Sequence, residues 1–273
     1  MIDLDLDSNF ARLPTGLRLA FCEDRSEAQG AAPTLLLLHG VTDSHRSFDL
    51  LRPHLPRAAH VVALTLRGHG ESDKPAGGYQ VQDMARDAVA FMERQRIART
   101  VIVGHSMGAA VAHHVAVLAP ERVAGLALVG AFADFAGNEG VLDLITQTRA
   151  LGDPLDPAFV RGFQESCVAR PAPQAFMDQV VRESLKTPAR VWRDAIAALP
   201  LARLAEARAR IEAPALIIWG ERDAFCPEAD QAVLRAELPG AAFVRMRGVG
   251  HTPHWEAPAE TAAAIAGFWA ARR

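Results

Sequence analysis

One serine lies between two glycines at a point where the character of the chain changes. Ser106 is the centre of Gly104-His105-Ser106-Met107-Gly108, a G-x-S-x-G pattern. Residues 101–103 are apolar and predict a buried strand, and the small residues after Gly108 predict a helix. A serine in a tight strand-to-helix turn needs glycine neighbours, because side chains there would clash, and the helix start directs free N–H groups at developing negative charge. We therefore predict that Ser106 is a nucleophile.

Short apolar runs recur along the chain and predict the elements that position this serine. Nearly continuous apolar runs, typical of parallel strands buried on both faces, occupy residues 34–38, 61–64, 101–103, 126–129 and 216–219. Residues 10–13 and 17–21 predict a hairpin, and residues 242–246 a last, more exposed strand. Helical spacing between strands, as at Val81, Met84 and Ala88, implies a doubly wound, mostly parallel eight-stranded α/β sheet. Ligands of such sheets bind at the carboxyl ends of the strands.

The alternation of strands and helices stops after Gly130 and resumes near Ala215. The intervening segment is rich in glycine and proline among short helical patches, and a structureless loop of that length is improbable in a compact domain. We therefore predict a helical cap at residues 133–195, inserted into a core domain of residues 1–132 and 196–273.

Composition excludes several classes of partner. A formal net charge of −3 gives no basic surface for nucleic acid. The three cysteines form no CxxC pair, no residues have convincing metal-ligand spacing, and no phosphate-binding glycine motif occurs, so we expect neither metal nor cofactor. Residues 1–7 are acidic, unlike a signal peptide, and no apolar run is long enough for a bilayer. We expect a cytoplasmic monomer or homodimer with no membrane partner.

Four motifs in order make the chain resemble the α/β-hydrolase superfamily over essentially its whole length. Besides the serine turn, they are Leu38-His39-Gly40-Val41, Arg67-Gly68-His69-Gly70-Glu71-Ser72, and two later loops, Trp219-Gly220-Glu221-Arg222-Asp223 and Gly250-His251-Thr252-Pro253-His254-Trp255. The resemblance is to its serine esterases, enol-lactonases and meta-cleavage hydrolases. It implies that the backbone N–H groups of Val41 and Met107 form an oxyanion hole and that His39 shapes its loop. Thr65 stands where the family commonly has aspartate, a difference that concerns loop bracing, and His69 is expected to be structural.

The same resemblance supplies the partners of the serine. It implies that Asp223 orients the general base His251, and the order Ser106, Asp223, His251 agrees with the family. Asp134, after an earlier strand, is the rival acid, and His254 is the competing base.

Several residues are candidates for the walls of a substrate pocket. His105 is next to Ser106, and Trp255 follows His251 by four positions. Phe132 begins a series of apolar residues that continues through the cap, and Trp192 lies near the end of the cap beside Arg190. The apolar series predicts small to medium hydrophobic substrates.

The identity of the nucleophile narrows the reaction. Related haloalkane dehalogenases and epoxide hydrolases use aspartate where this chain has Ser106, and the only tyrosine, Tyr79, lies outside the cap. Serine suits cleavage of an ester or lactone through an acyl-enzyme. Carbon–carbon bond hydrolases are an alternative, because they use the same three residue types. Many of them have tryptophan at the position of Thr252, but Arg190 and Trp192 at the end of the cap are candidates to bind an acidic substrate. Perhydrolases share the triad, and a hydrolase-like sensor or partner-binding protein is the alternative of another class.

Overall fold

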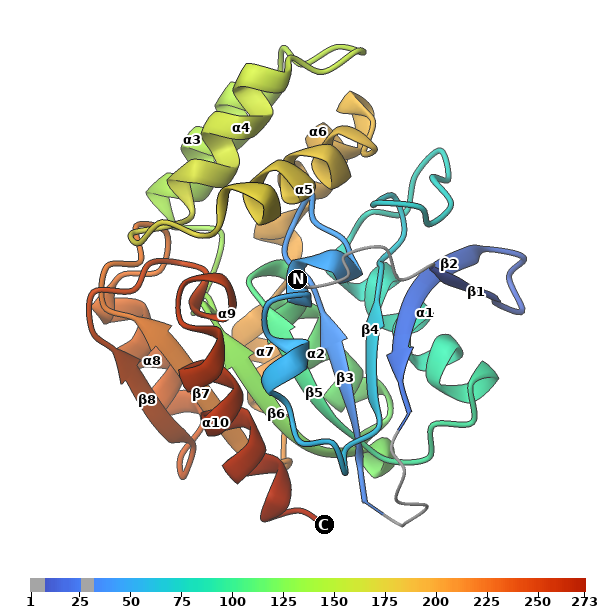
Figure 1. The fold of residues 1–273 in the computed structure, drawn as a ribbon, viewed down its shortest axis with the longest axis vertical. Helices are drawn as coiled ribbons and strands as arrows, with labels where there is room; N and C mark the ends of the chain where they lie inside the picture. Colours follow the sequence, from blue (N-terminus) through green and yellow to red (C-terminus); the bar gives the residue numbers. More distant parts are fainter. Residues whose placement is uncertain (1–7, 26–31) are drawn as a thin grey trace.

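The computed structural model describes residues 8–25 and 32–273, so the acidic residues 1–7, on which the signal-peptide prediction rests, lie outside the described residues. An open eight-stranded sheet forms the centre, in the order β1-β2-β4-β3-β5-β6-β7-β8 (Figure 1). The strands are β1 (Asn9–Arg12), β2 (Arg18–Asp24), β3 (Thr34–Leu38), β4 (Val61–Leu64), β5 (Thr100–His105), β6 (Val123–Val129), β7 (Ala215–Gly220) and β8 (Ala242–Met246). Only the β1–β2 and β2–β4 pairs are antiparallel. The predicted mostly parallel eight-stranded sheet is confirmed.

Each central strand is buried on both faces, which explains its continuous apolar sequence. In β3, Leu36 and Leu38 belong to one hydrophobic cluster, whereas Leu35 and Leu37 belong to another. The first cluster contains apolar residues of α1 (Val81–Arg94) and α2 (Met107–Leu118), and the second contains those of α10 (Pro258–Ala270). Helices therefore cover both faces of the sheet.

The remaining α-helices lie in the carboxyl-terminal half of the chain, and α3 to α6 are at the top of the molecule in Figure 1. They are α3 (Glu139–Thr148), α4 (Pro157–Ser166), α5 (Gln174–Leu185), α6 (Ala189–Ala198), α7 (Leu204–Arg208), α8 (Glu228–Glu237) and α9 (Pro253–Glu256). Among the described residues, no helix is both long and apolar enough to cross a membrane.

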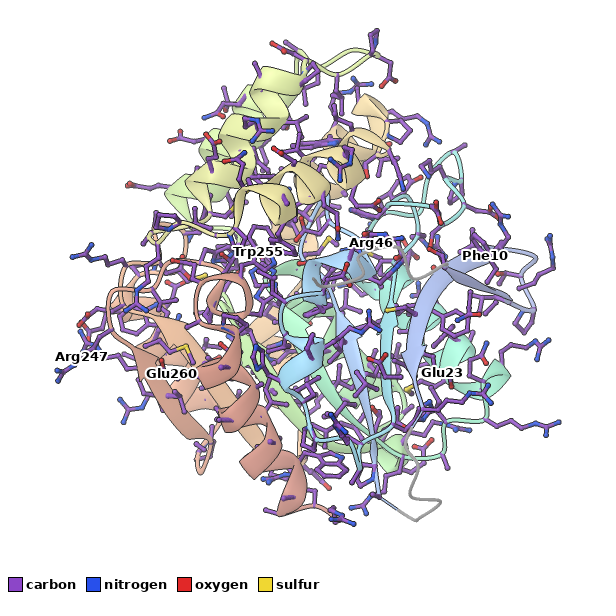
Figure 2. All side chains as sticks on the ribbon, viewed as in Figure 1. Phe10, Glu23, Arg46, Arg247, Trp255 and Glu260 are labelled. Atoms are coloured by element: carbon purple, nitrogen blue, oxygen red, sulfur yellow. The ribbon has the colours of Figure 1, made fainter. Side chains whose placement is uncertain are left out.

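Helices α3 to α6 connect β6 to β7 and lie beyond the carboxyl ends of the strands (Figure 1). Figure 2 places Trp255 where this α3–α6 segment meets the core, and its ring packs edge-on against Phe176 of α5, with ring centroids 5.6 Å apart. The last helix of the segment continues to Ala198, so the predicted boundary after residue 195 falls inside α6. Buried Ile196 and Ala198 extend its apolar face past that point.

We expect two helical glycines to respond oppositely to alanine. A Cβ on Gly108 in α2 would lie far inside the contact distance of the Leu38 carbonyl oxygen, a backbone atom that cannot rotate away, whereas Gly267 in α10 is exposed with no atom within 4 Å. Gly108→Ala should lower the free energy of unfolding by at least about 2 kcal/mol. Gly267→Ala should raise it by roughly 0.5–1 kcal/mol, because alanine favours helix. Urea unfolding measures both, and equal effects would contradict the close approach of α2 to β3.

Candidate functional site

Ser106 occupies a strained turn between β5 and α2. Its backbone has φ 53° and ψ −117°, a region that non-glycine residues rarely adopt. Gly104 permits the sharp turn, because a Cβ there would lie 2.6 Å from the Ala109 Cα. The Ser106 N–H donates to the Val129 carbonyl of β6 at 3.0 Å, which ties the turn to the sheet. The side chain thus lies at the carboxyl edge of the central strands.

Two loops bring an imidazole and a carboxylate together at the same edge. His251 Nδ1 lies 2.9 Å from Asp223 Oδ2, and both side chains are buried. Asp223 Oδ1 accepts the backbone N–H groups of Phe225 and Cys226 at 2.8 and 2.9 Å. A carboxylate facing Nδ1 favours the imidazole tautomer protonated there and leaves Nε2 free to accept a proton.

The histidine loop is held by a single carboxylate. Glu256 accepts the N–H groups of Gly250 and Thr252, and also those of Ala169 and Arg170 between α4 and α5. The His251 N–H donates to the Cys167 carbonyl at 3.0 Å. The α3–α6 segment therefore helps to position His251.

The loop after β3 brings backbone N–H groups to this edge. The ring of His39 bonds to the Gly40 carbonyl at 2.7 Å and accepts the Leu66 N–H at 3.0 Å, so His39 braces the loop. Val41 follows and lines the cavity that contains Ser106, while Met107 is the first residue of α2. The first N–H groups of a helix have no partner within the helix and suit an anion.

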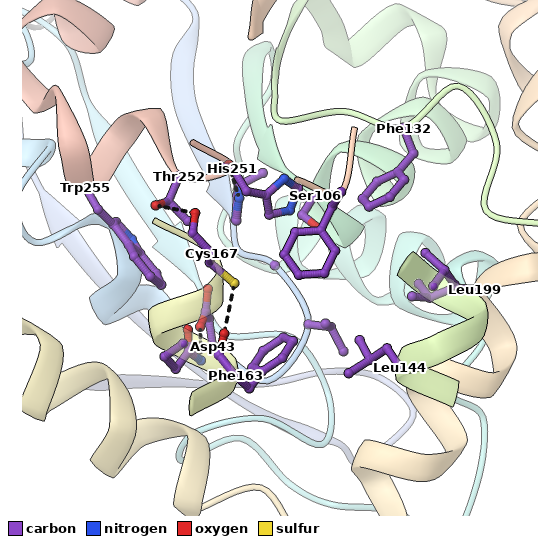
Figure 3. Close-up of a pocket in the computed structure, with 16 residues that line it drawn as sticks. Asp43, Ser106, Phe132, Leu144, Phe163, Cys167, Leu199, His251, Thr252 and Trp255 are labelled. Carbon is purple, nitrogen blue, oxygen red and sulfur yellow. Dashed lines mark hydrogen bonds between the residues drawn. The ribbon is translucent and has the colours of Figure 1, made fainter. Parts of the chain in front are cut away.

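A narrow cavity with a volume of about 30 Å³ contains both Ser106 and His251 (Figure 3). Its walls are mainly apolar and come from the core and from the α3–α6 segment: Phe132, Val141, Leu144, Phe163, Leu199 and Phe225. Asp43, Gln164 and Thr252 add polar groups. A nucleophile, an imidazole paired with a carboxylate, and N–H donors around one apolar cavity can support acyl transfer.

The predicted pocket residues divide into two groups. His105, Phe132 and Trp255 line the cavity. Trp192 does not: it is fully buried and packs against Phe159 and Phe163, with ring centroids 5.8 and 5.3 Å apart. The neighbouring Arg190 donates to the carbonyls of Lys74 and Pro75, and so braces the core rather than the cavity.

Burial keeps several imidazoles near the strand ends neutral, and one of them, His105, lines the cavity. Burial, with nearby imidazoles, lowers the pKa of His105 well below its usual value, and burial lowers that of His254 to about 3. The His254 ring bonds to the Ser47 hydroxyl at 3.1 Å instead of facing a carboxylate. Burial also lowers the pKa of His69 to about 4.

The position of Thr65 has a bracing role of its own. Its hydroxyl lies 2.8 Å from His45 Nδ1 and accepts the His45 N–H at 3.0 Å. The Ser72 hydroxyl donates to the Thr65 carbonyl at 2.7 Å. The bonds to His45 join the loop after β4 to the loop after β3, and the bond from Ser72 closes the loop after β4 on itself.

The rival acid lies elsewhere. Asp134 is exposed and accepts the N–H of Ala136 at 3.1 Å, whereas Asp223 is the carboxylate in contact with His251.

Sequence spacing indicated no metal group, yet folding brings ligand atoms of Asp223, Cys226 and His251 within 4.8 Å of one another. Burial raises the pKa of the Cys226 thiol well above its usual value, and the thiol donates to the Gly130 carbonyl. A metal needs a thiolate, so these contacts fit a His–Asp pair beside a neutral thiol better.

Sequence reasoning missed two polar residues of the cavity. Asp43 follows Val41 by two residues, and an acidic residue beside an apolar, N–H-presenting loop was a usable signal. Gln164 carried none, because its contact with Asp43 joins residues 121 positions apart.

Comparison with known proteins identifies the family. Residues 33–258 match the family model for the alpha/beta hydrolase fold. The chain belongs to this family. A relative, the dihydrolipoyllysine-residue acetyltransferase component of an acetoin cleaving system from Pseudomonas putida, is 28% identical over 84% of this chain, and the match spans 61% of that relative's length.

Solved structures superpose closely on this fold. An esterase from Exiguobacterium antarcticum has a TM-score of 0.86 and 21% identity, covering 97% of this chain and 100% of its own. The enol-lactonase from Burkholderia xenovorans LB400 has a TM-score of 0.83 and 21% identity, covering 96% and 100%. At these identities the likeness establishes the shared fold.

The buried Asp43 should make stability depend on pH. Burial raises the pKa of its carboxyl to about 7, although bonds from Gln164 and Ser47 and the nearby His251 oppose the shift. The folded protein therefore holds this proton more tightly than the unfolded chain, and the stabilisation present below about pH 4 is lost as the pH rises to about 7, by at most about 1.4 kcal/mol per pH unit. Asp43→Asn removes this loss.

Urea unfolding between pH 4.5 and 8 measures the effect. The stability of Asp43→Asn relative to wild type should increase with pH up to about 7 and then level off. Asp134→Asn, which changes an exposed carboxyl, is the matched control and should follow the wild-type curve. Parallel curves for Asp43→Asn and wild type would contradict the raised pKa.

Proposed function

We propose that this protein is a serine hydrolase of small to medium apolar carboxylic esters or lactones. The observation that carries the proposal is the 2.9 Å contact between His251 Nδ1 and Asp223 Oδ2 beside a cavity shared with Ser106, which stands at positive φ. Nucleophilic serine, general base and orienting carboxylate are the three roles that acyl transfer requires.

The reaction follows from these positions. Ser106 Oγ attacks the substrate carbonyl carbon while His251 Nε2 takes its proton, and Asp223 stabilises the imidazolium that forms. The N–H groups of Val41 and Met107 bind the oxyanion. The carbon–oxygen bond then breaks and His251 protonates the leaving alkoxide. Water attacks the acyl-enzyme with His251 again as base, which releases the acid and regenerates Ser106.

The α3–α6 segment acts in this proposal as a cap over the cavity. It supplies Leu144 and Phe163 to the apolar wall, and these side chains narrow the cavity, which favours small acyl groups. No arginine or lysine is among the described residues that line the cavity, which favours esters and lactones over the acidic substrates of carbon–carbon bond hydrolases.

Replacing the nucleophile should abolish turnover. Ser106→Ala is expected to lower kcat on p-nitrophenyl acetate by at least about 10⁴-fold, because the acyl-enzyme cannot form. Ser166→Ala, at an exposed serine in α4, is the matched control and should keep wild-type turnover. If the wild-type protein turns over no ester, lactone or meta-cleavage product, the enzyme proposal is refuted and a sensor or partner-binding protein is favoured.

Acyl-chain length should limit the rate. Across p-nitrophenyl esters from acetate to decanoate, kcat/KM should be highest for the short acyl groups and fall beyond about six carbons. Leu144→Ala widens the cavity and should move the optimum to longer chains. Leu142→Ala removes an exposed leucine of the same helix and should not. A wild-type maximum on long-chain triglycerides would refute the small-substrate proposal.

A further inference from the structure

Asp43 is a buried carboxyl that the reaction described above does not use. Its exposed fraction is 3%, and it lines the cavity that contains Ser106 and His251. Figure 3 shows it at the wall formed with Phe163 and Cys167. Among the described residues that line this cavity, no other carries a carboxyl group.

Asp43 lacks the partners that this fold gives to its structural carboxyls. Asp87 is equally buried and pairs through both oxygens with Arg67, and Asp49 accepts from Arg52 and Gln179. Asp43 forms no salt bridge with any described residue. Burying a carboxylate without a cation is costly unless several donors compensate, and this cost is why the pKa of Asp43 is raised to about 7; a further donor or a cation beside it would favour the ionised carboxylate.

The donors of Asp43 are neutral and shared. Gln164 Nε2 lies 3.1 Å from Oδ1, but also 2.8 Å from the Ser184 hydroxyl and 3.3 Å from that of Thr42, so its two hydrogens serve three acceptors. The Ser47 hydroxyl lies 3.2 Å from Oδ2 and 3.1 Å from His254 Nε2. A carboxylate has about four acceptor positions, so its oxygens retain capacity for another donor.

The backbone keeps Asp43 in this unfavourable place. Thr42 adopts φ 70° although it is β-branched, a conformation that costs of order 1–3 kcal/mol. The residues on both sides of it, Val41 and Asp43, line the cavity, whereas Thr42 bonds to Gln164. The backbone strain at Thr42 therefore holds Asp43, a carboxyl with few hydrogen-bond donors, in the wall of the cavity.

We propose that Asp43, with Gln164 beside it, forms a polar subsite that binds a hydrogen-bond donor, a hydroxyl or an ammonium group, carried by the substrate of the proposed Ser106 hydrolase. The donor occupies the free acceptor positions of Asp43, and an ammonium group also supplies the missing positive charge. The substrate class becomes esters or lactones with an apolar body and one donor group set apart from the scissile carbonyl. Sites built to bond a donor reject analogues that lack it, because their buried polar groups stay unpaired.

Matched substrates test the subsite. The acyl series compares methyl esters of straight-chain acids that end in methyl, hydroxyl or ammonium at equal heavy-atom number, and the alcohol series compares alkyl acetates with monoacetates of diols. Turnover is followed by titration of the released acid at constant pH. In wild type, kcat/KM for at least one donor-bearing member should exceed that of its methyl isostere at least tenfold, and the ammonium and hydroxyl arms identify which donor is preferred.

Substitution then assigns the preference to Asp43. Asp43→Leu keeps the shape of the side chain without its acceptors and should reduce the donor-to-methyl ratio to about one. Asp49→Asn, at a partly buried carboxyl of the same segment that does not line the cavity, should keep the wild-type ratio. Labelling of Ser106 by a fluorophosphonate counts competent sites, and a ratio taken within each variant does not depend on the folded fraction. Asp43→Asn serves in place of Asp43→Leu if the latter does not label, and should lower the ratio for the ammonium arm at least threefold.

The outcomes separate this inference from the function on which it rests. If wild type labels at Ser106 and cleaves plain esters but has a ratio near one in every series, the subsite is refuted and the hydrolase stands. An unchanged ratio in a competent Asp43→Leu refutes it too. If wild type neither labels nor turns over any member, the hydrolase proposal itself fails.

Discussion

Main-chain contacts without intervening side chains hold the site together. Gly108 places the start of α2 directly against the carbonyls of Leu38 and His39 at the end of β3. Gly130 after β6 makes a similar approach, since a Cβ there would lie 2.6 Å from the His251 carbonyl, and Gly220 at the end of β7 lies against the carbonyls of Val249 and Gly250. The turn that carries Ser106 and the loop that carries His251 are therefore positioned by backbone packed against strand ends. Such contacts leave little freedom, because backbone atoms cannot change rotamer.

The close packing at the strand ends also determines which histidines are neutral. Water is excluded at the strand ends, so burial lowers the pKa of His39, His105 and His254 and keeps these rings neutral. His251 differs, because a buried carboxylate faces its Nδ1. Among several imidazoles in one small volume, this contact gives one of them a partner that stabilises its charged form. Ring type and burial do not distinguish His251 from its neighbours, but the loop that carries Asp223 does.

The sequence predicted what depends on local pattern and chain order. Continuous apolar runs located the parallel strands, because burial on both faces leaves no polar alternation, and the turn around Ser106 follows from steric rules that act within five residues. Contacts between segments far apart in the chain produce no local sequence pattern from which they could be predicted. The place of Trp192 behind Phe163, and the bond between Gln164 and Asp43, depend on how α4 and α6 pack. The predicted cap boundary after residue 195 falls inside α6, because the apolar face of this helix continues through Ala198 with no change in composition.

Two carboxylates link the α3–α6 segment to the core, and their difference is informative. Glu256 is partly exposed and still receives four backbone N–H groups and the Thr252 hydroxyl, which fix the histidine loop against residues 169–170. Asp43 is more deeply buried, has the greater need for donors, and receives two shared neutral ones. If both served only to fasten the segment, the more buried group would require the fuller set of partners, since the cost of an unpaired charge rises with burial. The reverse distribution makes sense if Glu256 completes its bonds within the protein, whereas Asp43 completes its bonds with what enters the cavity.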